Sequence, residues 1–221
     1  GDFKKTFFNT LLKYGGSSKF QDLLSTANLQ TSNNTFLYNT TRYPDGGSAM
    51  FDYSLYSYAI FPIKDKLELD LGGRFNYSIL TSSFINNSTY EFPFKKITVR
   101  NSVFASSLRI FYSFYKKWGL NLSLYSGFRN PNIDDVGKVF SKNDTHVIIP
   151  NENLSPEKSL TFECGIKKTS VSNLKLDLYY FQNYLKNAIV RRDATLNGLD
   201  SLFYDGELMK IQMNQNLNSA I

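Results

Sequence analysis

The sequence holds few side chains of the types that perform catalysis. His146 is the only histidine and Cys164 is the only cysteine. A Ser-His-Asp triad would need His146, and the chain contains no Gly-x-Ser-x-Gly elbow to supply its nucleophile. The adjacent carboxylates Asp134 and Asp135 are interpreted as solvated loop residues, because nothing near them in the sequence completes an acid–base site. We therefore expect no enzyme activity, no resident metal and no cofactor.

The composition excludes several classes of protein. A single cysteine cannot form an internal disulfide, which argues against a small secreted scaffold. The net charge of +6 comes from scattered Lys and Arg, so we expect no nucleic-acid partner. Hydrophobic residues form 42% of the 221 residues, too many for a disordered tail, and the 16% aromatic share suits strands and membrane interfaces.

The elements that must position any site are amphipathic strands. The stretch LELDLGGRFNYSI, Leu67–Ile79, alternates apolar with polar residues almost without exception, so a strand there has one face of each kind. The same period recurs along the chain and predicts about eight strands in all. The other segments are Ser107–Phe114, Leu120–Tyr125, Leu160–Lys167 and Leu174–Tyr180, with less regular cases at Thr10–Ala27, Ala49–Phe61 and Leu208–Ile221.

The connections between these strands alternate between short and long. The short turns are Pro62–Lys66, Lys116–Gly119 and Thr169–Asn173. The long connections are Asn28–Ser48, Ile85–Arg100, Arg129–Ser159 and Arg191–Glu207. In an antiparallel meander this order puts every long loop at one end of the sheet, which is typical of outer-membrane barrels.

The charged residues of the polar face indicate whether each face of the sheet contacts lipid, water or a protein core. No run of about 18 apolar residues exists, so only a barrel could span a membrane. Charges buried unpaired in a packed core would be costly, whereas a hydrated lumen accepts them. The predicted lumen-facing residues are Glu68, Asp70, Arg74, Arg109, Glu163, Lys167, Lys175 and Asp177. The alternative is a soluble or surface β-sandwich that binds carbohydrate or protein and turns the same residues to solvent.

Closing only these strands into a barrel would crowd its interior. Inward positions would include Tyr125, Tyr179 and Phe181 besides the charged residues, and a barrel of about eight strands is only as wide as its side chains. The fold class predicted is therefore all-β: an antiparallel meander that forms one arc of a larger transmembrane barrel.

Two short boxes and the loop between them resemble a known family. The chain reads Phe128-Arg129-Asn130-Pro131, then a loop, then Asn151-Glu152-Asn153-Leu154 followed by Ser-Pro-Glu and a strand ending in Gly-x-Lys. This order is similar to the Phe-Arg-Ala-Pro and Asn-Pro-Asn-Leu boxes of TonB-dependent outer-membrane receptors, with Asn for Ala and Glu for Pro. Further agreeing pieces are TRYPDGGS at 41–48, LGGRFNY at 71–77, LNGLDSLFYDGE at 196–207 and QNLNSAI at 215–221.

The resemblance implies a bacterial outer-membrane importer with a barrel of about 22 strands. It also implies a plug domain inside the barrel, energy from the TonB complex, and contact with membrane lipid. The chain begins Gly-Asp-Phe and has room for only some of these strands, so we expect residues 1–221 to be a partial barrel domain without the plug and the last strands.

The same resemblance points to the connection between the two boxes as the ligand region. The candidate ligand-binding residues, on the long loops, are Arg129, Asn130, Asn132, His146, Asn151 and Asn153. In haem receptors of this family a histidine in this interval ligates iron, so His146 is also a haem-ligand hypothesis. The lumen-facing residues would contact the plug. The sequence does not distinguish a siderophore, haem, cobalamin, oligosaccharide or peptide as the ligand.

Overall fold

The computed structural model describes residues 1–39, 41–85, 95–115, 117–143, 145–169, 175–204 and 206–218. Its main sheet has eight strands in the order β1-β2-β5-β6-β7-β8-β11-β12, all neighbours antiparallel. Their bounds are β1 Asp2–Phe7, β2 Thr10–Leu23, β5 Ser48–Lys64, β6 Leu67–Ser83, β7 Lys96–Ser113, β8 Trp118–Arg129, β11 Glu157–Thr169 and β12 Lys175–Lys186.

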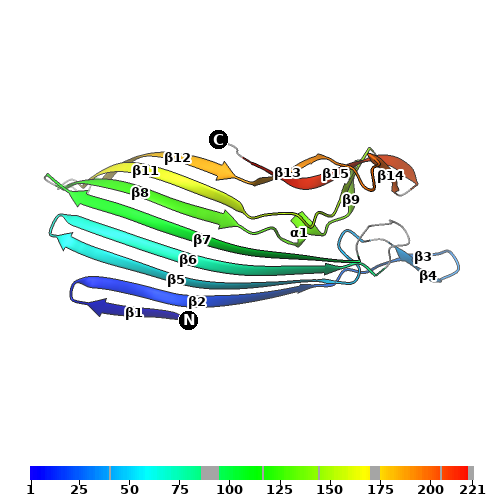
Figure 1. Ribbon diagram of the computed structural model, residues 1–221, viewed down its shortest axis with the longest axis horizontal. Helices are drawn as coiled ribbons and strands as arrows, with labels where there is room; N and C mark the ends of the chain where they lie inside the picture. Colours follow the sequence, from blue (N-terminus) through cyan, green and yellow to red (C-terminus); the bar gives the residue numbers. More distant parts are fainter. Residues whose placement is uncertain are drawn as a thin grey trace.

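Three smaller groups of elements lie at one end of this sheet (Figure 1). A five-stranded sheet contains β13 Ala188–Asp193, β14 Ser201–Tyr204, β15 Glu207–Leu217, β10 His146–Ile149 and β9 Phe140–Asn143. A separate hairpin contains β3 Ala27–Gln30 and β4 Phe36–Asn39, and the short helix α1 spans Ile133–Val136.

The predicted alternation of short and long connections is confirmed. Figure 1 shows the hairpin connections β1–β2, β5–β6 and β7–β8 together on the left, which we call the turn end. The connections that carry β3, β4, α1, β9 and β14 lie on the right, which we call the loop end. Of the predicted turn Thr169–Asn173, only Thr169 lies within the described residues, and residues 86–94 of the predicted connection Ile85–Arg100 lie outside them.

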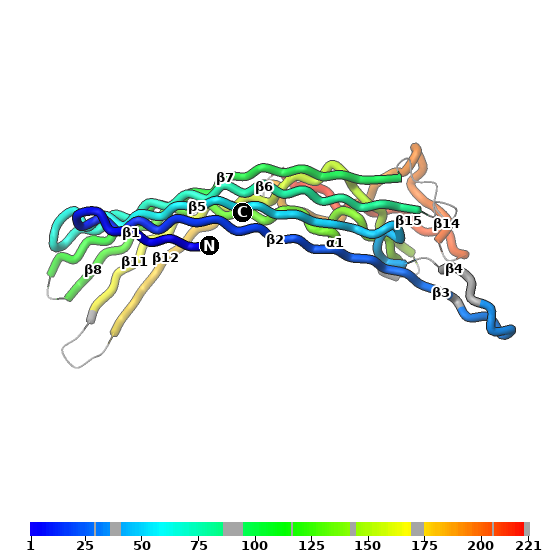
Figure 2. Tube along the Cα trace, turned by 90° about the horizontal axis from the view of Figure 1, so that it is seen from below, coloured from blue at the N-terminus to red at the C-terminus, as the bar shows by residue number. Residues whose placement is uncertain are grey.

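The ladder registers divide the side chains of the main sheet between two faces. Asp70 stands opposite Ile60 and Arg109, while its neighbour Leu71 stands opposite Ala59 and Leu108. Since successive residues of a strand point to opposite sides, the sheet has a polar face that carries Asp70 and an apolar face that carries Leu71. Figure 2 shows the sheet as an open arc with α1 beneath β6 and β7, so the polar face is the concave one.

Large apolar side chains remain uncovered on the convex, apolar face. Phe75, Phe104, Phe162 and Leu176 are 42–66% exposed, and no second sheet seals this face among the described residues. The architecture is therefore an unclosed arc of wall rather than a sandwich, as the strand pattern predicted.

The hydrophobic core lies on the opposite, polar face at the loop end. Met50, Leu80 and Ile97 of the main sheet are at most 7% exposed. Residues of the long connections and of β15 cover them: Val136, Val139, Val147, Ile149, Leu154, Tyr204, Met209 and Ile211. Each such buried aliphatic side chain contributes about 2 kcal/mol, so this cover is held by packing as well as by polar contacts.

Two sequence-based predictions of strands need correction. The main sheet has the predicted number of strands, but one of them is β1, which the sequence reasoning missed because Lys5 interrupts its short apolar set. The segment Leu208–Ile221 was expected to continue the meander, which is wrong for the described residues. Its strand β15 pairs with β13 and β14 antiparallel and with β10 in parallel, in the second sheet.

Candidate functional site

The connection between β8 and β11, residues 130–156, folds over the polar face at the loop end. It begins at Arg129, whose guanidinium contacts Asp135 at 2.6 Å and Glu157 at 2.5 Å. Glu157 also accepts a hydrogen bond from the backbone N–H of Ile189 at 2.7 Å. The Arg129 side chain thus ties both ends of the connection to β13, and this is a positioning role rather than a free binding group.

Asn132 starts α1 as a capping residue. Its side-chain oxygen accepts a hydrogen bond from the N–H of Asp135 at 2.9 Å, and the Asp135 carboxylate accepts one from the N–H of Asn132 at 3.0 Å. This reciprocal pair satisfies backbone groups that a helix start leaves unpaired, which fixes the local chain path. The end of the first box, Asn130-Pro131, together with the following Asn132, therefore builds the turn that brings the connection inward.

Asparagine side chains anchor the other end of the connection. Asn151 is 9% exposed and donates to the backbone oxygen of Asn214 at 2.7 Å, while Asn214 donates to the backbone oxygen of Asp135 at 2.9 Å. Asn216 exchanges two hydrogen bonds with the backbone of Ser155, at 2.8 and 2.9 Å. Sequence reasoning missed Asn214 and Asn216, although two amides on one side of a strand are a signal of such anchoring.

Asn153 lies beside Asn151, whereas His146 lies in β10. Asn153 is exposed, and its backbone N–H donates to Asn151 at 2.9 Å. The Nδ1 atom of His146 lies 2.7 Å from the Thr145 hydroxyl, in a strand paired on both sides. The structure therefore does not bring the six candidate ligand residues to one place. Among the described residues no group of three or more His, Cys, Asp or Glu could hold a metal ion.

A groove of about 690 Å³ opens on the polar face beside the first box. Asn130 reaches across to the sheet, where its amide donates to the side-chain oxygen of Asn76 at 2.6 Å and to Asp52 at 3.4 Å. Asn76 is 3% exposed and donates to Ser54. The lining residues that matter for binding are Lys19, Asp52, Arg74, Asn76, Asn130 and Asn132.

This groove offers both hydrogen-bond donors and positive charge. Lys19 and Arg74 are exposed, and Arg74 donates to the Ser54 hydroxyl at 2.9 Å. The Asn130 side-chain oxygen is buried and has no hydrogen-bond partner among the described residues. Polar groups that converge on an open concavity are typical of a site that recognises a polar or anionic ligand.

The turn-end half of the polar face carries a charged cluster. Asp70 is 2% exposed, accepts a hydrogen bond from Tyr58 at 2.6 Å and pairs with Arg109 at 2.8 Å. Arg109 also contacts Glu68. Two carboxylates thus share one guanidinium. The guanidinium neutralises the buried Asp70 carboxylate, and the cluster keeps a net negative charge.

The remaining predicted lumen residues lie on the same face. Glu163 accepts a hydrogen bond from Asn121 at 3.2 Å, and Lys167 stands opposite Asp177 in the register of β11 and β12. Lys175 stands opposite Thr169, two positions farther along the same face. The sheet therefore places all eight predicted residues on the polar side.

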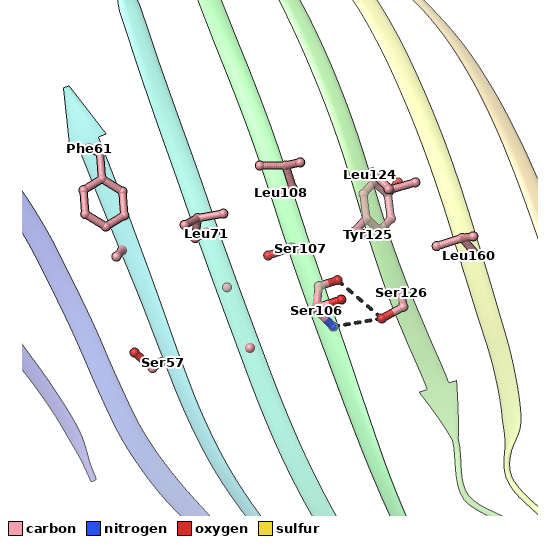
Figure 3. A pocket seen from close by; sticks show the side chains of 13 residues that line it. Ser57, Phe61, Leu71, Ser106, Ser107, Leu108, Leu124, Tyr125, Ser126 and Leu160 are labelled. Carbon is pink, nitrogen blue, oxygen red and sulfur yellow. Dashed lines mark hydrogen bonds between the residues drawn. The ribbon is translucent and has the colours of Figure 1, made fainter. Parts of the chain in front are cut away.

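A second hollow, of about 450 Å³, lies on the apolar face (Figure 3). Small residues of four neighbouring strands form its floor, and Phe61, Leu71, Leu108, Leu124 and Leu160 form its rim. The Ser126 hydroxyl accepts from the N–H of Ser106 at 2.8 Å and donates to its oxygen at 3.4 Å. This hollow offers no free charged group, so the groove on the polar face is the better candidate site.

Outside the main sheet, a contact between a loop and α1 changes the pKa of Tyr43. Tyr43 donates a hydrogen bond to Asp134 at 3.0 Å, which together with partial burial raises the pKa of the phenol above its usual range. This contact joins the segment after β4 to α1. Within the described ranges no helix is both long and apolar enough to cross a membrane.

Comparison with known proteins reveals one family. The sequence profile of the family described as TonB dependent receptor-like, beta-barrel matches residues 1–218. No curated protein sequence matches the chain.

Several solved structures share this fold. The hemophore receptor HasR of Serratia marcescens, a double mutant solved with its hemophore HasA and heme, matches with a TM-score of 0.72 at 14% identity, over 99% of this chain and 36% of that chain. The copper transporter OprC matches with a TM-score of 0.69 at 10% identity, over 97% and 32% of the two chains. The siderophore receptor PiuA from Acinetobacter baumannii gives 0.63 at 14% identity, over 96% and 33%.

This chain spans about a third of the length of these structures. At such low identity the likeness shows the fold alone.

Proposed function

Because this chain belongs to the TonB-dependent receptor-like β-barrel family, we propose that it forms part of the wall of a receptor that imports a scarce nutrient complex with energy delivered by TonB. Members of this family are bacterial outer-membrane proteins, and this chain is part of one. The loop end would then face the cell exterior, since barrels of this class carry their long loops outside and short turns in the periplasm.

The observation that carries the proposal is the groove beside Asn130. It lies on the concave face near the middle of β6, beside the inward-folded connection, on the path of a solute that would enter from the loop end. The cover formed by residues 130–156 gives that part of the wall a fixed shape. Lys19 and Arg74 would supply donors to an anionic or oxygen-rich nutrient complex.

The two faces of the sheet support the other partners. The apolar face would contact outer-membrane lipid, because its large side chains are exposed and its backbone is paired in ladders. The charged cluster of Glu68, Asp70 and Arg109 on the polar face would contact a plug domain of the same receptor. The TonB complex would act through that plug rather than through this wall.

The proposal is tested by uptake into cells that carry the full-length receptor. Haem, ferric siderophores and copper are the first nutrients to measure, in cells with and without TonB. The double variant Lys19→Gln/Arg74→Gln is expected to reduce TonB-dependent uptake about tenfold or more, because two charge-assisted contacts are lost. The matched control is Lys175→Gln, an exposed lysine of the same face far from the groove.

Two results would contradict the proposal. One is uptake that does not depend on TonB for any nutrient tested. The other is a groove variant that reaches the membrane at the normal level and transports as the wild type does, since the groove would then play no part.

The haem hypothesis for His146 stays a separate prediction. Imidazole is a competent axial ligand to haem iron, and His146 starts β10 next to Thr145. Haem affinity of the full-length receptor should fall in His146→Ala if the hypothesis holds. Unchanged affinity removes it without affecting the importer proposal.

A further inference from the structure

Three cationic side chains converge on one aromatic ring at the loop end. The Arg42 guanidinium lies 4.6 Å from the centroid of the Phe140 ring, and the Lys138 ammonium lies 4.3 Å from it. The Arg191 guanidinium lies 5.6 Å from the same centroid. A ring attracts cations through its negative face, and its two faces cannot keep three cations well apart.

The three cations come from segments that are distant in sequence. The N–H of Val139 donates to the backbone oxygen of Arg42 at 3.0 Å, which holds Arg42 beside the strand that carries Phe140. Phe140 stands opposite Ile148, whereas the neighbours of Ile148, Val147 and Ile149, pack into the core, so Phe140 faces away from the core. Arg191 comes from β13, which is joined to β9 through β15 and β10. The convergence is thus a product of the tertiary fold.

Only one of the three charges of this cluster has an ion-pair partner among the described residues. Lys138 pairs with Asp134 at 3.3 Å and is largely buried. Within the part of the chain that the structure describes, neither Arg42 nor Arg191 forms an ion pair, and both are exposed. Like charges held this close repel one another, and a bound anion would relieve that repulsion.

We propose that Arg42, Lys138 and Arg191 form an anion site that binds a phosphate or carboxylate group of a solute at the loop end. Guanidinium groups suit this ligand class, because each presents a planar fork of donors to two oxygens. The Phe140 ring holds the cations in place, so little side-chain freedom is lost when the anion binds. Placing the site on the route of an imported nutrient rests on the proposed function, but anion binding itself does not.

The test uses the full-length receptor in nanodiscs of phosphatidylcholine, which has no net charge. Inorganic pyrophosphate is titrated by calorimetry at low salt, where charge interactions are least screened. The double variant Arg42→Gln/Arg191→Gln is expected to bind pyrophosphate about tenfold more weakly or worse. The matched control is Arg192→Gln, which removes the exposed neighbouring arginine of the same strand and is expected to bind as the wild type does.

The outcomes separate the possible roles of the cluster. Equal pyrophosphate binding by the double variant and the wild type overturns the proposal, since the cations would then only stack on Phe140. Loss of pyrophosphate binding when phosphatidylglycerol is added to the nanodisc assigns the cluster to a lipid headgroup and also overturns it. If the double variant does not fold, each single variant carries the same test, because both side chains are exposed.

These outcomes are independent of nutrient import. An uptake defect in the Lys19→Gln/Arg74→Gln receptor with normal pyrophosphate binding would support the groove and leave the anion site intact. Pyrophosphate binding that depends on Arg42 and Arg191 would stand even if no transport were found.

Discussion

The two halves of the polar face differ in a way that the apolar face does not. On the turn-end half, β6 presents Glu68, Asp70 and Arg74 toward the concavity. On the loop-end half the same side of β6 presents Leu80, which is 1% exposed, and Phe84 follows on that side just after the strand. The apolar face keeps one character from Leu67 to Ile79, and only Thr81 and Ser83 at its end are polar.

This difference shows how to detect an inward-folded cover. A strand that borders water on one side should stay polar on that side to its end. Where that side turns apolar, another segment must pack on it, and here residues 130–156 and β15 do so. A change from polar to apolar residues along one face of a wall strand therefore shows where a long connection packs against that face inside the concavity.

The largest expected effect tests the covered half directly. Leu80→Ser should lower the free energy of unfolding by about 3 kcal/mol, because it empties a packed site and buries a hydroxyl. Phe181→Ser is the matched control, since Phe181 lies on the polar face of β12 and is 69% exposed. Urea unfolding of the receptor from liposomes measures both. Equal effects would mean that the two halves of the face do not differ.

The next effect separates the two faces of one strand. Leu124 and Tyr125 are neighbours with similar exposure, 44% and 38%, but they point to opposite sides of β8. Leu124→Arg should cost about 3 kcal/mol in a bilayer, because it places a charge against lipid. Tyr125→Arg should cost less than about 1 kcal/mol, since its charge would enter a hydrated concavity.

Insertion into liposomes, followed by gel mobility before and after heating, compares these two variants. A Tyr125→Arg receptor that inserts no better than Leu124→Arg would contradict the assignment of the faces.

A smaller effect concerns what holds the cover in place. Asn151→Ala should raise amide hydrogen exchange in residues 130–156, with a local loss of about 1.5 kcal/mol, because the buried Asn214 oxygen loses its donor. Asn153→Ala should change exchange little, since its exposed side chain makes no described contact. A larger effect at Asn153 than at Asn151 would count against the anchoring role of the buried amide.

The smallest expected effect is a pH dependence at the edge of the cover. The raised pKa of Tyr43 means that folding favours the neutral phenol, so its contribution is complete below the ordinary pKa near 10 and is lost as pH rises through the higher folded value. Solvent screens this contact, so we expect at most about 0.5 kcal/mol. Proteolysis of the 41–47 segment at pH 9 and 11 measures it. Tyr43→Phe should remove the dependence, and a Phe variant that keeps it would assign the effect elsewhere.

Much of the wall could be predicted because alternation is a local property. In the segment Leu67–Ile79 the alternation of apolar and polar residues alone shows which residues share a face. The observed strand β6 is only a few residues longer than this segment. The eight charged residues assigned to one side lie on one side for the same reason. The strand β1 was missed because one lysine on the apolar face of a strand of only 6 residues removes the signal.

The candidate site was less accessible to sequence reasoning. Asn130 of the first box and Asn132 just after it were among the predicted ligand residues, and both line the groove. Lys19 comes from β2 and Arg74 from β6, and nothing in the spacing of these residues relates them to the box. The cations around Phe140 likewise belong to three segments that are distant in sequence. They meet only because the connection between β8 and β11 folds inward onto the second sheet.

The sequence by itself determined most strands of the wall, their two faces and the order of short and long connections. These depend on which neighbours in the chain are apolar and on the fixed period of a strand. Only the tertiary structure decided that residues 130–156 fold inward, that β15 joins a second sheet, and that Lys19, Arg74 and Asn130 share one groove. Those outcomes depend on packing between residues far apart in the chain, which no local pattern records.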